Sequence, residues 1–174
     1  MGTKFTYALT LTIIGAVFRL LLYFTGFETE KLNIGQYLNW VMLPVVFGVY
    51  FLALKAVREE NPHKALSYGQ GVGAGTLISL ISSAMSAVYT WVHLKFINTN
   101  FADYQIELLR QRWAASGLGD AQMEQAEKMT RMMMSPGMSA VFALVAGVIF
   151  GLIISLIVAA FVKRAAPADA EPPL

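Results

Sequence analysis

The chain has 174 residues, of which 56% are hydrophobic and only 14% are charged, with a formal net charge of +2 and no cysteine. Soluble domains carry about 25% charged residues, so this composition excludes an ordinary soluble domain. The lack of cysteine excludes disulfides, thiol nucleophiles and thiolate metal sites. The small net charge does not indicate a nucleic-acid partner.

Four stretches are long and apolar enough to cross a bilayer, whose hydrocarbon core needs about 20 apolar residues of helix. They cover residues 5–27, 37–54, 71–94 and 138–162. The first stretch is too long for the apolar region of a cleaved signal peptide, so we expect it to be retained as a helix. Pro44, inside the second stretch, is expected to kink it because proline removes a backbone hydrogen bond.

The polar segment 98–137, between the third and fourth stretches, has a helical pattern of its own. Apolar residues recur in it at helical spacing, namely Ala102, Ile106, Leu109 and Trp113. Gly-Leu-Gly at 117–119 breaks this pattern, and Asp120 is placed to cap a second helix that continues to about residue 134. The segment is therefore predicted to form a helical hairpin with its apolar faces on the membrane surface or on the ends of the spanning helices.

The predicted fold is an all-α integral membrane protein with four transmembrane helices and a helical hairpin in the third loop. We expect residues 1–166 to form a single four-helix transmembrane domain, of which 98–137 lie outside the membrane. The proline-rich segment 167–174 is predicted to be a disordered tail.

Four spans place both chain ends on one side of the membrane, and positive charge predicts which side. Six cations flank helix ends in the short segments of that side, namely Lys4, Lys55, Arg58, Lys64, Lys163 and Arg164. The opposite side has as many cations, but most are spread through the long loop. The positive-inside rule then predicts cytoplasmic termini in a multi-pass protein of the bacterial inner membrane.

Small residues recur at helical spacing in the third and fourth stretches. The helix-packing candidates are Gly71, Gly75 and Ser79 in the third stretch, and Gly147, Gly151 and Ser155 in the fourth. Small residues let helix backbones approach closely in lipid, where helices gain little from apolar contact. The two stretches are therefore predicted to pack on each other. Homo-oligomer contacts and a chance pattern in an apolar sequence are the alternatives.

Arg19 is the one charged residue inside a predicted span. A charge at membrane depth raises a functional hypothesis, so a polar site is one reading. The other is structural, because Arg19 lies about eight residues from the end of its helix and a long side chain can reach towards the interface. Glu28 or Glu30 would then pair with it there.

Several site types are not predicted. No Asp or Glu lies inside a span, which disfavours proton-coupled transport. His63 and His93 are isolated in the sequence and are expected to be ordinary solvent or interface residues rather than zinc ligands. The glycine-rich run 69–75 lacks the lysine and the preceding strand of a phosphate-binding loop. We therefore expect no metal, no cofactor and no nucleotide.

Methionines are concentrated near the end of the long loop, at Met123, Met129, Met132, Met133, Met134 and Met138. Methionine is a flexible apolar residue that suits packing and partner surfaces, and this is the favoured interpretation. Cu(I) binding by the thioethers is the alternative.

Several short motifs match a known family. They are Ser-Tyr-Gly at 67–69, Phe-Ile-Asn at 96–98 followed by Phe101, the run GVIFGLIIS at 147–155, and Lys163-Arg164. In these the chain resembles the Domain-of-Unknown-Function 4199 family of small bacterial membrane proteins. Where members of that family often have proline after the asparagine, this chain has Thr99. The resemblance implies four spans and a long third loop, and it implies no activity.

Three function classes follow. The favoured one is a non-enzymatic accessory or scaffold protein of the bacterial inner membrane, whose helices pack by the small-residue stripes and which docks a protein partner through the 98–137 hairpin. The alternative is a small oligomeric transporter or channel that uses Arg19 and the serine face of the third stretch. An enzyme of lipid substrates would depend on the loop acids Asp103, Glu107, Glu124 and Glu127, which read better as a solvated face. No catalytic constellation is found, so we do not expect an enzyme.

Overall fold

The structure is a computed structural model that describes residues 2–167, and these form helices joined by short turns, with no strand among them. Four helical segments within this range are long and apolar enough to cross a membrane. They are α1 (Thr3–Phe24), α2 (Leu32–Leu38) continued through the 3-10 turn η1 (Asn39–Val41) into α3 (Met42–Glu60), α4 (Tyr68–Val92) with its π-helical end η3 (His93–Ile97), and α7 (Pro136–Val162). The predicted all-α fold with four spans is confirmed.

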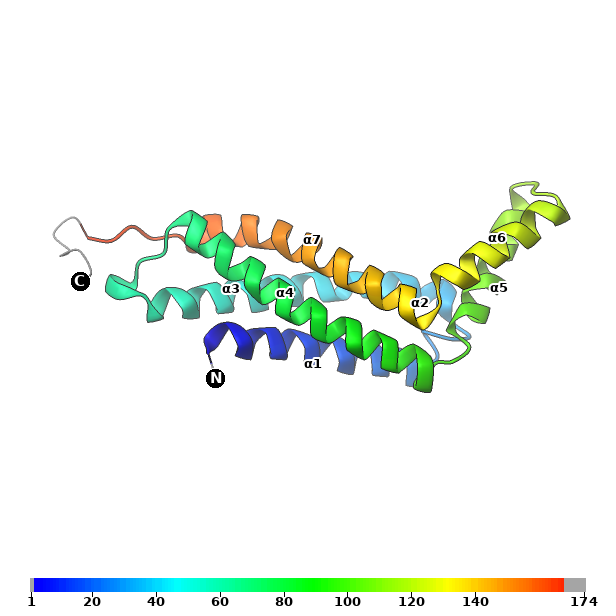
Figure 1. Cartoon of the computed structure of the whole chain (residues 1–174), viewed down its shortest axis with the longest axis horizontal. Helices are drawn as coiled ribbons and strands as arrows, with labels where there is room; N and C mark the ends of the chain where they lie inside the picture. The colour runs from blue at the N-terminus through cyan, green and yellow to red at the C-terminus, as the bar shows by residue number, and fades with distance from the viewer. Residues whose placement is uncertain (1, 168–174) are drawn as a thin grey trace.

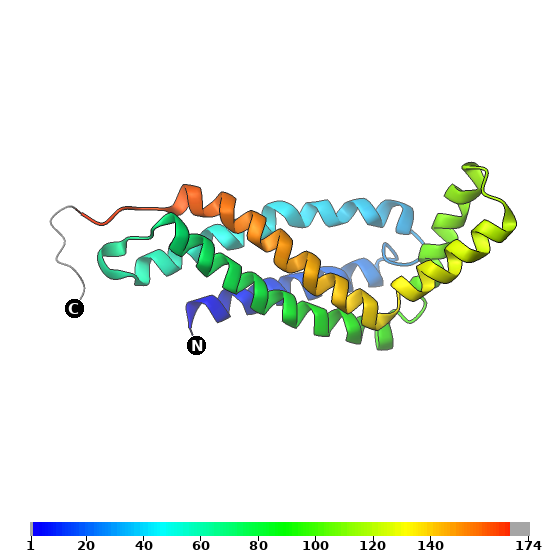
Figure 2. The same cartoon turned by 45° about the horizontal axis from the view of Figure 1, so that its top comes forward.

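The four spans lie side by side along the length of the molecule (Figures 1 and 2). Helix α4 packs on α7 over much of its length, α1 packs on α4, and α3 packs on both α1 and α7. The short turn η2 (Pro62–Lys64) closes one end of the bundle. At that end Leu66 and Arg164 exchange two backbone hydrogen bonds of 2.9 Å, and the Thr3 hydroxyl donates to Glu60. The first and last described segments therefore meet at the same end.

The outer faces of the bundle are as apolar as its interior. Leu54, Ile78 and Ile154 are fully buried among the helices. Large apolar side chains are nevertheless exposed on every span, including Leu21, Phe51, Leu80, Ile149 and Phe161. So much exposed apolar surface is unfavourable in water, and the hydrocarbon core of a bilayer is the environment that suits long apolar helices. The chain is a multi-pass membrane protein.

The second span is longer and less regular than predicted. It begins at Leu32 rather than near residue 37, and η1 interrupts the α-helix before α3 resumes at Met42. Pro44 is the third residue of α3, and its missing N–H removes a bond that would otherwise reach back to residue 40 in η1. The irregular backbone therefore lies directly before the proline.

The segment after α4 contains two further helices, α5 (Phe101–Ala115) and α6 (Asp120–Met133), which project from the end of the bundle opposite η2 (Figure 2). Gly117, with a φ of 75°, provides the left-handed residue of the turn between them. The cap of α6 is Gly119, so the predicted cap Asp120 is instead the first helical residue. Of the predicted disordered tail 167–174, all but Pro167 lies outside the described residues.

Candidate functional site

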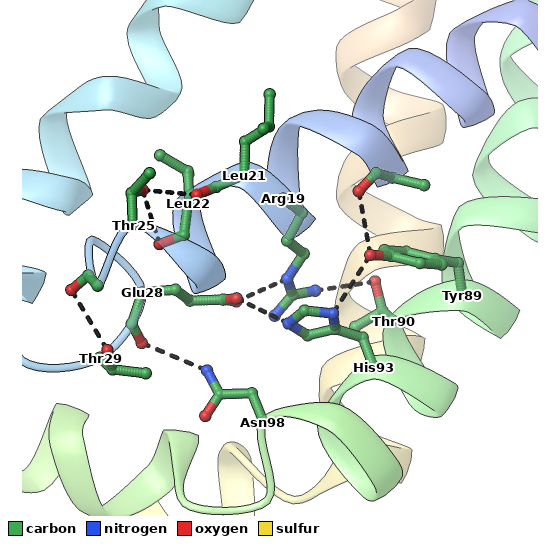
Figure 3. Close-up of polar contacts among 12 residues, drawn as sticks. Arg19, Leu21, Leu22, Thr25, Glu28, Thr29, Tyr89, Thr90, His93 and Asn98 are labelled. Carbon is green, nitrogen blue, oxygen red and sulfur yellow. Dashed lines mark hydrogen bonds and ion pairs between the residues drawn. The ribbon is translucent and has the colours of Figure 1, made fainter.

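A buried charged cluster lies where α1, the turn after it and the end of α4 meet, next to the base of the α5–α6 pair (Figure 3). Arg19 Nε donates to Glu28 Oε1 at 2.7 Å. The other oxygen of the same carboxylate, Oε2, lies 2.7 Å from His93 Nε2. Glu28 is 6% exposed and His93 is 0% exposed, so this is a charged network inside the protein.

The turn that carries Glu28 is held by backbone contacts on both sides. Gly26 takes a φ of 81°, which reverses the chain after α1, and the Glu28 N–H donates to the Leu22 carbonyl at 3.1 Å. Gly35 of α2 packs against the Phe27 backbone so closely that a Cβ at this position would overlap the Phe27 carbonyl. Glycine at position 35 is therefore what lets α2 approach the turn.

The end of α4 places His93 opposite this turn. The Asn98 N–H bonds back to the His93 carbonyl at 2.8 Å, across five residues, which makes the last turn π-helical. Such wide turns occur frequently at functional sites. Asn98, itself 2% exposed, also donates through Nδ2 to the Glu28 carbonyl at 3.3 Å, so the chain after α4 is bonded to the turn after α1.

Arg19 has further partners beyond the carboxylate. Its Nη1 donates to Thr90 Oγ1 at 3.3 Å, and its guanidinium carbon lies 5.7 Å from the centre of the Phe101 ring, the first residue of α5. A guanidinium over an aromatic face is stabilised by the ring quadrupole. Arg19 therefore connects α1 to α4 and to the base of the α5–α6 pair.

The charges around Glu28 keep it ionised. Burial raises the pKa of the Glu28 carboxyl, but hydrogen bonds from His93 and Arg19, with the positive charge of Arg19, lower it by more. The net effect places its pKa below the usual value of 4.5. A buried carboxylate is stable only with such partners.

One sequence interpretation of this site is wrong, and one alternative is resolved. Arg19 was expected to find either Glu28 or Glu30, and it pairs with Glu28. His93 was expected to be an ordinary solvent or interface residue, but it is fully buried and bonded to Glu28. The available signal was its position inside the third apolar stretch, because an ionisable residue within a span needs a buried partner.

A cavity of about 430 Å³ adjoins the cluster. Arg19 and Glu28 form one side of it, and Gln36, Asn39 and Gln105 supply carboxamides from α2, η1 and α5. Apolar side chains complete the walls, including Phe18, Phe27 and Met42. Such a volume exceeds the roughly 30 Å³ of one water molecule many times over, and its polar groups provide partners for water.

The six helix-packing candidates lie apart from this cluster, along the α4–α7 contact. Ser79 Oγ of α4 donates to the Gly147 carbonyl at 3.1 Å, and a Cβ on Gly147 would lie 2.5 Å from Ser83 Oγ. A Cβ on Gly71 would lie 3.0 Å from the Ala159 methyl group. The two helix backbones therefore approach closely at these positions.

The remaining candidates face one another in the same contact. A Cβ on Gly75 would clash with Ser155 Oγ, and a Cβ on Gly151 would clash with Ser79 Oγ and meet Tyr50 Oη at 2.5 Å. Ser155 Oγ turns back to donate to its own helix, at the Gly151 carbonyl, at 2.6 Å. Gly75, Gly147 and Gly151 are thus each matched to a serine hydroxyl of the facing helix, whereas Gly71 is matched to the Ala159 methyl group.

Three of the loop acids, Asp103, Glu124 and Glu127, are engaged in surface ion pairs. Glu127 contacts Arg110 and Arg131, and Asp103 lies 2.7 Å from Arg131 Nη1. The hydrogen bonds from Arg110 and then from Arg131 hold the pKa of Glu127 below its usual value. A general acid at neutral pH needs a raised pKa, so this arrangement is opposite to what acid catalysis requires.

Metal-ligand geometry is not found in the part of the chain that the structure describes. Within residues 2–167, no three side chains of His, Asp or Glu are grouped to hold a metal ion. The loop methionines Met129, Met132 and Met133 are exposed on α6, at 56%, 63% and 43%. Such exposure gives α6 an apolar face that the rest of the described chain leaves open.

Comparison with known protein families identifies a match that covers most of the chain. The family model described as "Protein of unknown function (DUF4199)" matches residues 6–164. No curated protein and no solved structure matches the chain. Nearly the whole described structure lies within the matched range.

Proposed function

Since the chain belongs to the DUF4199 family, whose description names no activity, we propose from its own structure that it is a non-enzymatic accessory or scaffold protein of the bacterial inner membrane. It docks a partner protein through the segment 98–137, which contains α5 and α6. The observation that supports this proposal most strongly is the projection of this helical pair beyond the four spans (Figure 1).

Ion pairs make the projecting segment a defined surface rather than a loose loop. Arg110 of α5 pairs with Glu127 of α6, and Arg131 of α6 pairs with both Glu127 and Asp103. Isolated surface pairs contribute little, but a connected set that joins two helices limits their relative motion. Arg112 Nη2, in the last turn of α5, donates to Gln36 Oε1 of α2 at 3.1 Å, which ties the pair to the spans.

The exposed methionines provide the contact chemistry. Met129, Met132 and Met133 follow the helical spacing of one face of α6, so their thioethers form a continuous apolar strip. Flexible methionine side chains adapt to a partner's apolar groove. A partner with an amphipathic helix or an apolar groove near the membrane surface would bury this strip.

The proposed orientation places the termini in the cytoplasm and the α5–α6 pair on the opposite side. Lys64, Arg58 and Arg164 lie at the bundle end where the described chain begins and ends, and they lie close to the ends of the spans. Cations in such short segments favour the cytoplasmic side.

The transporter alternative has less support from the described contacts. Ser79 donates to the Gly147 and Val148 carbonyls within the α4–α7 contact, and Arg19 is paired with Glu28. Ser79 is therefore occupied within the helix contact, and Arg19, although it bounds a cavity, has its charge compensated by Glu28. The accessory function therefore has the stronger geometric support.

The test is co-purification with matched hairpin variants. The tagged protein is extracted gently from native membranes, and co-purifying proteins are quantified by mass spectrometry. We expect a stoichiometric partner, which Met129→Lys with Met132→Lys removes and which Glu124→Gln, an exposed change on the same helix, retains. A photo-crosslinking residue at 132 should label that same partner.

Two results would contradict the proposal. Protein that purifies without a stoichiometric partner would remove its basis, and flux assays in liposomes would then follow. A partner retained by the double-lysine variant and not labelled from position 132 would place docking elsewhere. A second copy of this chain as the labelled species would identify self-association as the interaction.

A further inference from the structure

His93 presents both ring nitrogens to oxygen atoms inside the protein. Nε2 lies 2.7 Å from Glu28 Oε2, and Nδ1 lies 3.2 Å from the hydroxyl oxygen of Tyr89, one helical turn earlier (Figure 3). The ring is 0% exposed, so water does not compete for either nitrogen. The protonation state of the ring is therefore set by what these two oxygens are able to donate or accept.

The Glu28 contact assigns a hydrogen to Nε2. Glu28 is ionised and accepts from Arg19, and an ionised carboxylate has no hydrogen to donate. The short contact to His93 is thus a bond from Nε2–H to the carboxylate. The question of protonation is left to Nδ1 alone.

Tyr89 is able to serve Nδ1 in either state. Its hydroxyl has a single hydrogen but two partners, the Ala16 carbonyl of α1 at 3.1 Å and His93 Nδ1 at 3.2 Å. When the ring is neutral, the Tyr89 hydroxyl donates its hydrogen to Nδ1. With a protonated ring, Nδ1–H donates to the hydroxyl oxygen, and the hydroxyl hydrogen turns to Ala16. Rotation about one C–O bond therefore satisfies both states.

The charges around the ring also accommodate a proton. Arg19 and Tyr23 face it from α1, Glu28 faces it from the turn, and Tyr89 lies on its own helix. The adjacent cation Lys95 lies over the Trp91 and Phe96 rings instead. Helix α7 contains no charged residue. The charges of Arg19 and Glu28 cancel. The positive charge of a protonated His93 ring would lie next to the Glu28 carboxylate, to which the ring is already hydrogen-bonded.

We propose that His93 is a proton-binding site, which takes up one proton on Nδ1 within the folded protein while Tyr89 turns its hydroxyl from Nδ1 to the Ala16 carbonyl. The ligand is a proton delivered by hydronium, which becomes water. The cavity bounded by Arg19 and Glu28 lies on the outer side of the same cluster and has the volume to admit water. The ring lies where three parts of the chain meet, because Arg19 bonds α1 to Glu28 of the turn, and Asn98 bonds the segment before α5 to the same turn.

The chain allows a direct measurement because it has only two histidines. His63, the other one, is exposed at the opposite end of the bundle with a φ of 57°, a conformation that asparagine tolerates well. His63→Asn therefore leaves a folded protein with one histidine. Ring-15N labelling of this variant in lipid nanodiscs then reports the protonation of each nitrogen of His93.

We expect Nε2 to remain protonated as the buffer is made more acidic, because it faces the Glu28 carboxylate. Nδ1 should gain its proton while circular dichroism shows the helices intact. A ring that keeps a single protonation state throughout, or one that gains the proton only as the helices are lost, would overturn the proposal.

Two tyrosine variants test the hydroxyl relay. Tyr89→Phe removes the hydroxyl that lies 3.2 Å from Nδ1, so the ring-15N signals of the variant should no longer show a hydrogen-bonded Nδ1. Tyr23→Phe is the matched control, because the Tyr23 ring packs edge-on against His93 at 5.8 Å between centroids and the change keeps that ring. Equal behaviour of the two variants would exclude the role of Tyr89.

Discussion

His93 Nε2 lies 2.7 Å from Glu28 Oε2, although 65 residues separate the two along the chain. The contact closes the end of α4 onto the turn after α1, and Arg19 joins it from the other carboxylate oxygen. Both partners are buried, so the loss of Glu28 leaves His93 without its carboxylate in a low-dielectric site, and leaves Arg19 without its ion-pair partner.

Glu28→Gln should destabilise the protein by about 3 kcal/mol, because it leaves Arg19 and His93 without their carboxylate. Reversible unfolding in mixed micelles measures the difference. Glu30→Gln is the control, since Glu30 is exposed and two residues away, and it should change stability by no more than about 0.5 kcal/mol. Equal stability of the two variants would show that the buried pair contributes nothing.

The pH dependence of stability should follow from the lowered pKa of Glu28. A carboxyl with a lower pKa in the folded state stabilises the protein above its unfolded value of 4.5, and this stabilisation is lost as the pH falls through the folded value. Unfolding measured from pH 7 to pH 3 should therefore show a larger loss below 4.5 in the parent than in Glu28→Gln. The loop carboxylates titrate in both proteins and cancel in the difference. Parallel curves would contradict the assignment.

Gly75→Ala should destabilise the α4–α7 contact by about 1–3 kcal/mol, because the added methyl group meets the Ser155 hydroxyl. Gly73→Ala in the same helix is the control, since nothing lies within 4 Å of a Cβ there. Alanine favours a helix over glycine by about 0.5–1 kcal/mol, so the control should be neutral or stabilised. Thermal unfolding of the two variants gives the comparison, and the same sign for both would refute close packing at Gly75.

Gly35→Ala should separate α2 from the turn that carries Glu28, because a Cβ would overlap the Phe27 carbonyl. We expect a loss of about 2 kcal/mol and a change in the Nε2–H signal of His93, which reports the bond to Glu28. Gly48→Ala in α3, where a Cβ meets nothing within 4 Å, should leave the signal unchanged. An unaltered Nε2–H signal in Gly35→Ala would show that the turn does not depend on this approach.

The spans could be predicted from the sequence because lipid imposes a local rule. A bilayer requires about 20 consecutive apolar residues, and this requirement is satisfied within each segment separately. The small-residue pattern of α4 and α7 is local in the same way, although only the structure shows which glycine faces which serine. The extent of the second span was less predictable, because α2 and η1 carry Asn33, Gln36 and Asn39 and so lower the local hydropathy.

The class of protein follows from local sequence alone: four apolar helices, one polar segment between the last two, and an arginine within reach of an acid. That His93, and not a second carboxylate, completes the Arg19–Glu28 pair becomes visible only in the packed bundle. Helical periodicity carries information over neighbouring turns, whereas this contact joins the end of α4 to a turn 65 residues earlier. The packing of α1 on α4 brings His93 close to Glu28. Both side chains are buried there, and because water is excluded, the Glu28 carboxylate needs His93 as a hydrogen-bond partner.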